Sequence, residues 1–255
     1  MGFEYLSVEE AVKARGLRVV FVSKVPSPWG EAAKGIFHIK RIPFAGVRLV
    51  YDNEALKQWA GQLSGPVAIY DDEVPRSGWA EILMLAERLA PQPALLPREP
   101  HERARALSVS DKICGPEGLG WSRRLQCVHA GITRAGGFNE RVAGYLGKKY
   151  GYDPARAPEY GERVRQLLRE LGATLRERRG DGPYYLGRTL SAADVYSATA
   201  VAMFMPLPEI HCAMHPDSRA AFEWLDDETR AALDPALLEH RDMMYTRHLE
   251  LPLSL

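Results

Sequence analysis

The pattern of apolar and polar positions changes once along this chain, near residue 95. Before that point, short apolar runs alternate with amphipathic stretches, as in Leu17–Val22 and the helical repeat that follows it to about Arg41. Short runs rich in β-branched residues are typical of buried strands. We therefore expect a strand–helix–strand unit by Tyr51, with a right-handed crossover. A third strand is expected at Val67–Tyr70, and a further helix after Ser77.

The first sixteen residues predict a helical extension in front of this unit. Ser7-Val8-Glu9-Glu10 has the pattern of a capping box, in which the first and last side chains satisfy each other's backbone N–H groups. We expect a short helix that ends near Gly16.

The second half of the chain predicts helices alone. Four prolines fall between Ala90 and Pro100, and such a run indicates a linker. We place the domain boundary inside it, with an α/β domain over residues 1–93, a linker over 94–100 and an all-helical domain over 101–255. The expected helices are 101–114, 121–133, 139–150, a long one around 164–175, an almost entirely apolar one after Ser191, 217–233 and 235–249.

Composition argues against several classes of function. A chain of 255 residues suits one large domain or two small ones. Its 33 basic and 33 acidic residues cancel, so no basic excess indicates nucleic acid or anionic lipid as a partner. The longest apolar stretch, residues 195–207, is too short to span a bilayer and contains Pro206. The charged segment 1–16 does not resemble a secretory signal.

Cysteines and histidines give no indication of a disulfide framework or a metal site. Cys114, Cys127 and Cys212 are widely spaced and form no Cys-x-x-Cys, which fits the reducing cytoplasm. Metal-ligand spacing is also absent among His38, His129, His211 and His215. We therefore expect a cytoplasmic protein that holds no metal.

The turn from the first strand to its helix is the strongest candidate for chemistry. Ser27 falls at the N-cap position and Pro28 at the first helical position, where its missing N–H costs nothing. The positive end of a helix suits an anion, including a thiolate. The alternative is that Ser27 is only a helix cap. Ser23 is a second candidate hydroxyl, closer to the end of the strand.

Two further positions could bind a ligand through the backbone. Ser77, with Arg76 before it, lies at another helix start, where N–H groups, a hydroxyl and a guanidinium can bind a carboxylate. Pro66 precedes the third strand. The alternatives are an ordinary cap at Ser77 and an ordinary strand-start proline at Pro66.

The layout resembles that of the soluble glutathione transferases over nearly the whole chain. Three local features carry the resemblance: the active-site serine turn at Ser27-Pro28-Trp29, Pro66 before the third strand with Ser77 opening the next helix, and the segment 185–195. That segment, Tyr-Leu-Gly-Arg-Thr-Leu-Ser-Ala-Ala-Asp-Val, is similar to the family's capping box in its second domain. The resemblance implies a thioredoxin-like first domain with a mixed sheet and one antiparallel edge, followed by an all-helical domain.

The resemblance also implies a glutathione site. Ser27 would donate a hydrogen bond to the thiolate of glutathione, whose thiol has a pKa of about 8.5 when free. A cis bond at Gly65–Pro66 would hold the cysteinyl backbone. Glutathione would also contact Trp29, and the γ-glutamyl carboxylate would lie on Arg76 and Ser77. For the glycyl carboxylate the candidates are Lys57, Lys40 and Gln62, each of which could instead be a solvated surface residue.

The sequence departs from the family's pattern at two of these positions. Arg76 stands where the family usually has an acidic residue, and Ser64-Gly65 stands where a β-branched residue usually precedes the proline.

The function implied is transfer of glutathione to a hydrophobic electrophile by a cytoplasmic homodimer, with a role in detoxification. The electrophile would bind where the two domains meet, near Trp29, Trp121 and Tyr145. Two alternatives remain on the same fold, a non-catalytic carrier of glutathione or apolar ligands and a protein-interaction module. A thiol-disulfide reductase is less favoured, because Ser27 stands where the reductase classes have cysteine.

Overall fold

The computed structural model describes residues 3–255, and its first part is built on one mixed sheet. The strand order is β1 (Tyr5–Leu6), β3 (Phe44–Arg48), β2 (Leu17–Phe21) and β4 (Val67–Tyr70). The first three strands are parallel, and β4 pairs antiparallel with β2. The expected mixed sheet with one antiparallel edge is therefore confirmed. Beyond β4, Arg76 forms a single isolated antiparallel bridge with Ala68.

The segment before β2 corrects one expectation. It was predicted to be helical, yet it opens with the two-residue strand β1, which adds to the sheet beside β3. The helix α1 (Val8–Lys13) follows, and the capping box between Ser7 and Glu10 is present. A strand of two residues is too short for alternation of polarity to reveal it.

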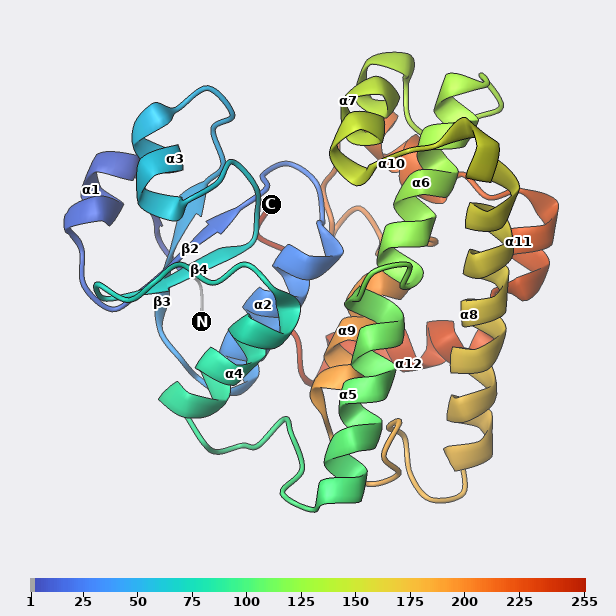
Figure 1. Ribbon diagram of the computed structural model, residues 1–255. Helices are drawn as coiled ribbons and strands as arrows, with labels where there is room; N and C mark the ends of the chain where they lie inside the picture. The colour runs from blue at the N-terminus through green and yellow to red at the C-terminus, as the bar shows by residue number, and fades with distance from the viewer. Residues whose placement is uncertain (1–2) are drawn as a thin grey trace.

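Helices cover both faces of the sheet (Figure 1). α2 (Pro28–Ile39) and α4 (Trp79–Leu89) pack together on one face, and α1 packs with α3 (Glu54–Ala60) on the other. Successive residues of β2 separate into the two cores, since Val19 belongs to one apolar cluster and Val20 to the other. This alternation is the two-residue period of a strand with both faces buried.

From residue 100 onward the structure has helices and no strand. In order they are α5 (Pro100–Cys114), α6 (Leu119–Ile132), α7 (Glu140–Tyr150), η1 (Pro154–Arg156), α8 (Ala157–Arg178), α9 (Ala192–Val201), α10 (Pro216–Glu223), α11 (Asp227–Ala232) and α12 (Pro235–Arg247). No helix within residues 3–255 is long and apolar enough to cross a membrane.

One expected helix is two helices. Residues 217–233 were predicted to be continuous, but the chain breaks after α10, and Asp226 starts α11 by accepting a hydrogen bond from the N–H of Thr229 at 2.6 Å. Asp226 is an N-cap that the apolar pattern alone did not reveal.

The predicted capping box at the start of α9 is confirmed and forms part of a buried network. Asp194 is fully buried, and one carboxylate oxygen accepts from the N–H of Ser191 at 2.9 Å. The other accepts from the N–H of Tyr185 at 2.9 Å and from Nε2 of His240 at 3.0 Å. Asp194 thereby links α9, the loop before it and α12.

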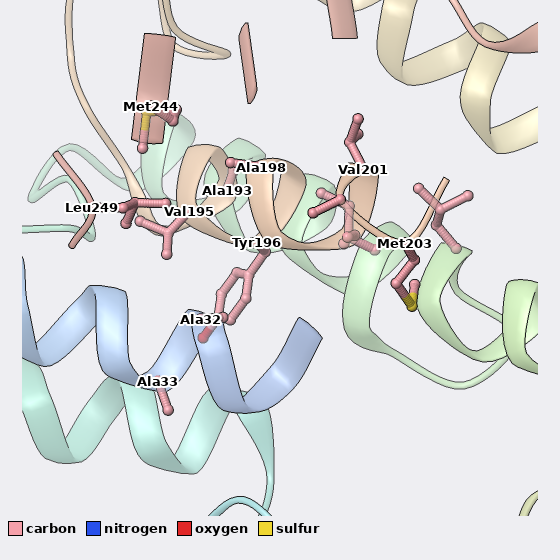
Figure 2. Packing of buried hydrophobic residues seen from close by; sticks show 14 of the residues in the cluster. Ala32, Ala33, Ala193, Val195, Tyr196, Ala198, Val201, Met203, Met244 and Leu249 are labelled. Atoms are coloured by element: carbon pink, nitrogen blue, oxygen red, sulfur yellow. The ribbon is translucent and has the colours of Figure 1, made fainter. Parts of the chain in front are cut away.

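α9 is also the contact between the helical part and the sheet part. Figure 2 shows Tyr196 pointing from α9 toward α2, beside the small side chains of Ala32 and Ala33. The hydroxyl of Tyr196 donates to the backbone carbonyl of Trp79 at 3.0 Å, at the start of α4. Gly35 of α2 lies so close to this layer that an added Cβ would be 2.6 Å from Leu249.

Candidate functional site

The turn between β2 and α2 places the hydroxyl of Ser27 at the start of a helix. Ser27 occupies the N-cap position as expected, with extended backbone angles, and Pro28 is the first helical residue. Ser27 is buried, with 6% of its surface exposed, but its side chain makes no capping hydrogen bond. The hydroxyl instead lines a cavity between the two parts of the chain. Ser23 lines none of the cavities described below.

Two cavities meet beside this turn. The first cavity, of about 290 Å³, is lined by residues that include Trp29, Gln62, Gly65, Pro66, Ser77 and Trp121. The second cavity, of about 450 Å³, is larger and mainly apolar, and its lining includes Ser27, Tyr51, Arg124, Phe138, Tyr145 and Phe222. Gly65, Lys149 and Tyr150 line both. A ligand in one cavity would therefore lie next to a ligand in the other.

Gly65 stands where these cavities join, and the peptide bond between Gly65 and Pro66 is cis, as expected. A Cβ at Gly65 would be 3.1 Å from the backbone N of Val22 and 3.2 Å from the backbone O of Val20. Both contacts are to backbone atoms, which cannot move aside as a side chain can. This crowding favours glycine at position 65, where the family usually has a β-branched residue.

The start of α4 borders the first cavity through Ser77 and Gly78. The N-cap is Gly78, so Ser77 lies one position outside the helix that it was expected to open. The carboxylate of Glu81 accepts from the N–H of Gly78 at 3.0 Å and from that of Ser77 at 3.2 Å. An acidic side chain of the protein thus occupies the N–H groups that were predicted to bind a ligand carboxylate.

No protein-family model matches the sequence, and no curated protein matches it by sequence. Solved structures do match. A glutathione S-transferase from Methylobacterium radiotolerans, in complex with glutathione sulfonate, is 19% identical, with a TM-score of 0.60 over 91% of each chain. A second, from Methylobacillus flagellatus with GSH bound, is 14% identical, with a TM-score of 0.61 over 91% of this chain and 96% of that one.

Glutathione transferase Omega 3C from Trametes versicolor is 17% identical, with a TM-score of 0.56 over 94% of this chain and 89% of its own. The chain has the glutathione transferase fold. The expected fold class is therefore confirmed, with a thioredoxin-like first part and a helical second part. At these identities the likeness establishes the fold, and the function has to be argued from the site.

Three predicted glutathione ligands lie outside both cavities of this glutathione transferase fold. Arg76 pairs with Glu73 at 2.7 Å. Lys57 is exposed at the end of α3. Lys40 is buried and pairs with Glu87 at 2.7 Å, which ties α2 to α4 and makes its role structural. Roles for Arg76 and Lys57 in binding glutathione stay predictions.

The aromatic residues expected near the electrophile divide between the cavities. Trp29 and Trp121 line the first, and Tyr145 lines the second. Tyr150 lies between the two tryptophans, with ring centroids 6.4 Å from Trp29 and 4.8 Å from Trp121. Tyr150 was not singled out in the sequence, because nothing local distinguishes it from an ordinary helix-end residue.

Lys149 is a second residue that sequence reasoning missed. Burial lowers the pKa of its amine, and the positive charge of Arg124 lowers it further. A cation placed against another cation in the wall of a cavity is a common feature of functional sites. Two adjacent arginines, Arg123 and Arg124, in a helix with no acidic residue and no other lysine or arginine were the signal that could have located this wall.

The cysteines do not supply a reactive thiolate. All three are free thiols. Cys114 lines the first cavity, but burial raises the pKa of its thiol well above the ordinary value, so the thiol stays protonated at neutral pH.

One group of potential metal ligands occurs within residues 3–255, and nothing in its sequence spacing had indicated a metal site. Glu99, His101 and Glu102 place ligand atoms within 4.8 Å of one another at the start of α5. The carboxylate of Glu99 already accepts from two backbone N–H groups of that helix, at 2.9 and 2.6 Å. The cluster therefore has a capping role, and it lies in a different part of the fold from both cavities. The absence of a bound metal stays a prediction.

Proposed function

We propose that this chain is a glutathione transferase that binds glutathione in the first cavity and a hydrophobic electrophile in the second. The observation that carries the proposal is that the two cavities join at Gly65, with Ser27 in the wall of the second. A peptide held along Gly65 and Pro66 would place its thiol at this junction. The predicted contacts to Trp29 and Ser77 fit the lining of the first cavity.

The chemistry needs a thiolate, and the turn at Ser27 suits one. A hydroxyl donates a hydrogen bond to an anionic sulfur without itself ionising, and the N-terminus of α2 adds a favourable dipole. The thiolate sulfur would form a bond to the electrophilic carbon, and the leaving group would depart with its electron pair. The proton of the thiol passes to solvent. Because Ser27 makes no capping hydrogen bond, its hydroxyl is available for this role.

Serine-type activation, the cytoplasm as location and the homodimer belong to the same proposal. Small domains of this layout usually pair about a two-fold axis, so the same patch would be used on both subunits. A strictly monomeric mass in solution at micromolar concentration would contradict the dimer.

One observation favours the alternative of a non-catalytic carrier or interaction module. Glu81 occupies the N–H groups of Ser77 and Gly78, so a γ-glutamyl carboxylate would have to displace it or bind elsewhere. Retention on immobilised glutathione separates these possibilities. Absence of retention would favour an interaction module, and retention without turnover of any electrophile in a panel would favour a carrier.

The decisive experiment compares Ser27→Ala with Ser23→Ala. In the Ser27 variant the pKa of bound glutathione, followed by thiolate absorbance, should rise, and turnover near neutral pH should fall about 10- to 100-fold, as expected for one hydrogen bond to a charged group. The matched Ser23 variant should leave both unchanged, because Ser23 lines neither cavity. Equal thiol titration in both variants would contradict the assigned role.

The stability of the Ser27→Ala variant gives an independent measurement. A helix cap lost to alanine typically costs about 1 kcal/mol. Since the hydroxyl of Ser27 makes no capping bond, Ser27→Ala should leave the free energy of unfolding nearly unchanged. Loss of activity without loss of stability would then separate catalysis from folding.

A further inference from the structure

The second cavity has a buried cation in its wall without a partner. Arg124 of α6 is 8% exposed and lines this cavity. Its Nε is buried without a hydrogen bond, as is the Nε of the neighbouring Arg123, but no nitrogen of the Arg124 guanidinium forms a hydrogen bond or ion pair with any residue from 3 to 255. The guanidinium instead lies over two aromatic rings, with its carbon 5.8 Å from the centroid of Phe138 and 5.6 Å from that of Phe222.

The neighbouring residue shows what a structural arginine looks like in this helix. Arg123 is 1% exposed and donates to Gln126 at 2.9 Å and to the backbone carbonyls of Phe222, at 3.3 Å, and Trp224. Burying a charge without such partners is costly. Arg124 lacks such partners, and its terminal nitrogens, unlike Nε, are accessible to a ligand in the cavity. The paired N–H donors of a guanidinium match a carboxylate in particular.

The other charged residues that line the second cavity, Lys149 and Asp217, are both exposed, and neither neutralises Arg124. Lys149 lines the same wall, and the pKa of its amine is lowered first by burial and then by Arg124. The acidic residue in the lining is Asp217, whose side chain is 76% exposed and lies 3.7 Å from His215. This carboxylate faces solvent and leaves Arg124 unpaired.

The rest of the lining suits a flat apolar body. Phe138, Val142, Leu146 and Phe222 supply apolar walls. Tyr51 and Tyr145 meet edge to face, with ring centroids 5.6 Å apart. Burial raises the pKa of Tyr51 to about 12, with a contribution from Tyr145, so its phenol stays protonated at neutral pH and can donate a hydrogen bond.

We propose that the electrophile carries a carboxylate, as on a flat aromatic acid, and that Arg124 binds this carboxylate while the electrophilic carbon faces Ser27. This assignment of substrate class rests on the proposed transferase function. In the test reaction the thiolate sulfur adds to a ring carbon, the carbon–chlorine bond breaks, chloride leaves with the electron pair, and the thiol proton goes to solvent.

The test uses para-chloro-meta-nitrobenzoate and the matching benzamide, each with glutathione and each corrected for its uncatalysed rate. The parent protein should prefer the benzoate in kcat/KM. Arg124→Gln should reduce that preference about tenfold or more, as expected for a bidentate charged pair, and Arg124→Lys should restore part of it. Arg169→Gln removes the same charge from an exposed position of α8 and should leave the preference unchanged.

A binding measurement separates failure of this inference from failure of the transferase proposal. Calorimetry with para-methyl-meta-nitrobenzoate, which has no leaving group, needs neither glutathione nor turnover. Its Kd should weaken about tenfold or more in Arg124→Gln relative to the parent and to Arg169→Gln. Benzoate binding that depends on Arg124 supports the inference even if no glutathione is turned over. Equal affinity in parent and Arg124→Gln, or equal use of benzoate and benzamide by the parent, would overturn it.

Discussion

Arg123 and Arg124 are consecutive, buried residues of α6. Of the two, only Arg123 forms hydrogen bonds with other residues between positions 3 and 255. The helix turns by about 100° per residue, so adjacent side chains leave it in different directions. Arg123 points toward the C-terminal end of α10, where it donates to the backbone carbonyls of Phe222 and Trp224. Arg124 points to the second cavity. The same residue type thus serves folding at one position and ligand recognition, as proposed here, at the next.

This difference predicts opposite effects on stability. Arg124→Met keeps the apolar stem and removes an unpaired buried charge, so it should raise the free energy of unfolding of the ligand-free protein by about 1 kcal/mol. Arg123→Met leaves buried acceptors unpaired and should lower the free energy of unfolding by about 3 kcal/mol. Urea denaturation of both variants beside the parent measures the two changes. If both variants lost stability equally, Arg124 would be a structural residue.

A second pair of positions tests how the wall of the second cavity is held. A Cβ at Gly131 of α6 would overlap the backbone carbonyl oxygen of Phe138, whereas a Cβ at Gly144 of α7 meets nothing within 4 Å. Gly131→Ala should therefore cost about 1–3 kcal/mol, as overpacking does. Gly144→Ala should add about 0.5–1 kcal/mol, because alanine is the better helix residue.

Thermal melts of the two alanine variants check this prediction, and ligand affinity adds a second measurement. Phe138 lines the second cavity, so its displacement in Gly131→Ala should weaken binding of the nitrobenzoate probe. An equal rise in melting temperature for both variants would show that the loop at Phe138 yields without cost.

Local chemistry is what made much of the fold predictable. The strand–turn–helix at Ser27, Pro66 before β4 and the capping box at Ser191 each depend on residues a few positions apart, and each is found where it was expected. The break between α10 and α11 was missed because Asp226 acts as a cap inside a stretch whose apolar spacing continues. The strand β1 was missed because its pairing with β3 is not encoded locally.

The site was predictable mainly on its sheet side, although Trp121 and Tyr145, which were expected near the electrophile, also line the cavities. Gly65, Pro66, Ser27 and Trp29 lie within motifs, and the structure brings them to the two joined cavities. The opposite walls come from α6, α7 and α10, whose side chains meet the turn only through the packing of the two parts of the chain. In the sequence, no motif around Arg124 indicated a role in ligand binding. In the structure, the role proposed for Arg124 rests on its lack of a hydrogen-bond partner within residues 3–255.

The pH dependence of stability should show a contribution from His248. The residue is partly buried, and its Nε2 lies 2.8 Å from the hydroxyl of Tyr184, which can donate a hydrogen bond to a neutral imidazole. Burial, followed by the charge of Arg247, lowers the pKa of His248 below its ordinary value of 6.5. The unfolded chain therefore binds a proton at a higher pH than the folded chain does. Stability from the neutral imidazole is complete above pH 6.5 and is lost as the pH falls from 6.5 toward the lower pKa of the folded state.

His248→Asn removes this titration while keeping a polar side chain. The free energy of unfolding of the parent minus that of the variant should be constant above neutrality and should decrease as the pH is lowered through the window below 6.5. Urea denaturation at several pH values measures the difference, and the subtraction cancels the other six histidines. Tyr184→Phe removes the hydrogen bond to the neutral ring. In that background, the pH-dependent part of the stability difference caused by His248→Asn should be smaller. A difference that grows on acidification would mean that the imidazole is protonated in the folded protein and that the contact with Tyr184 has the opposite polarity.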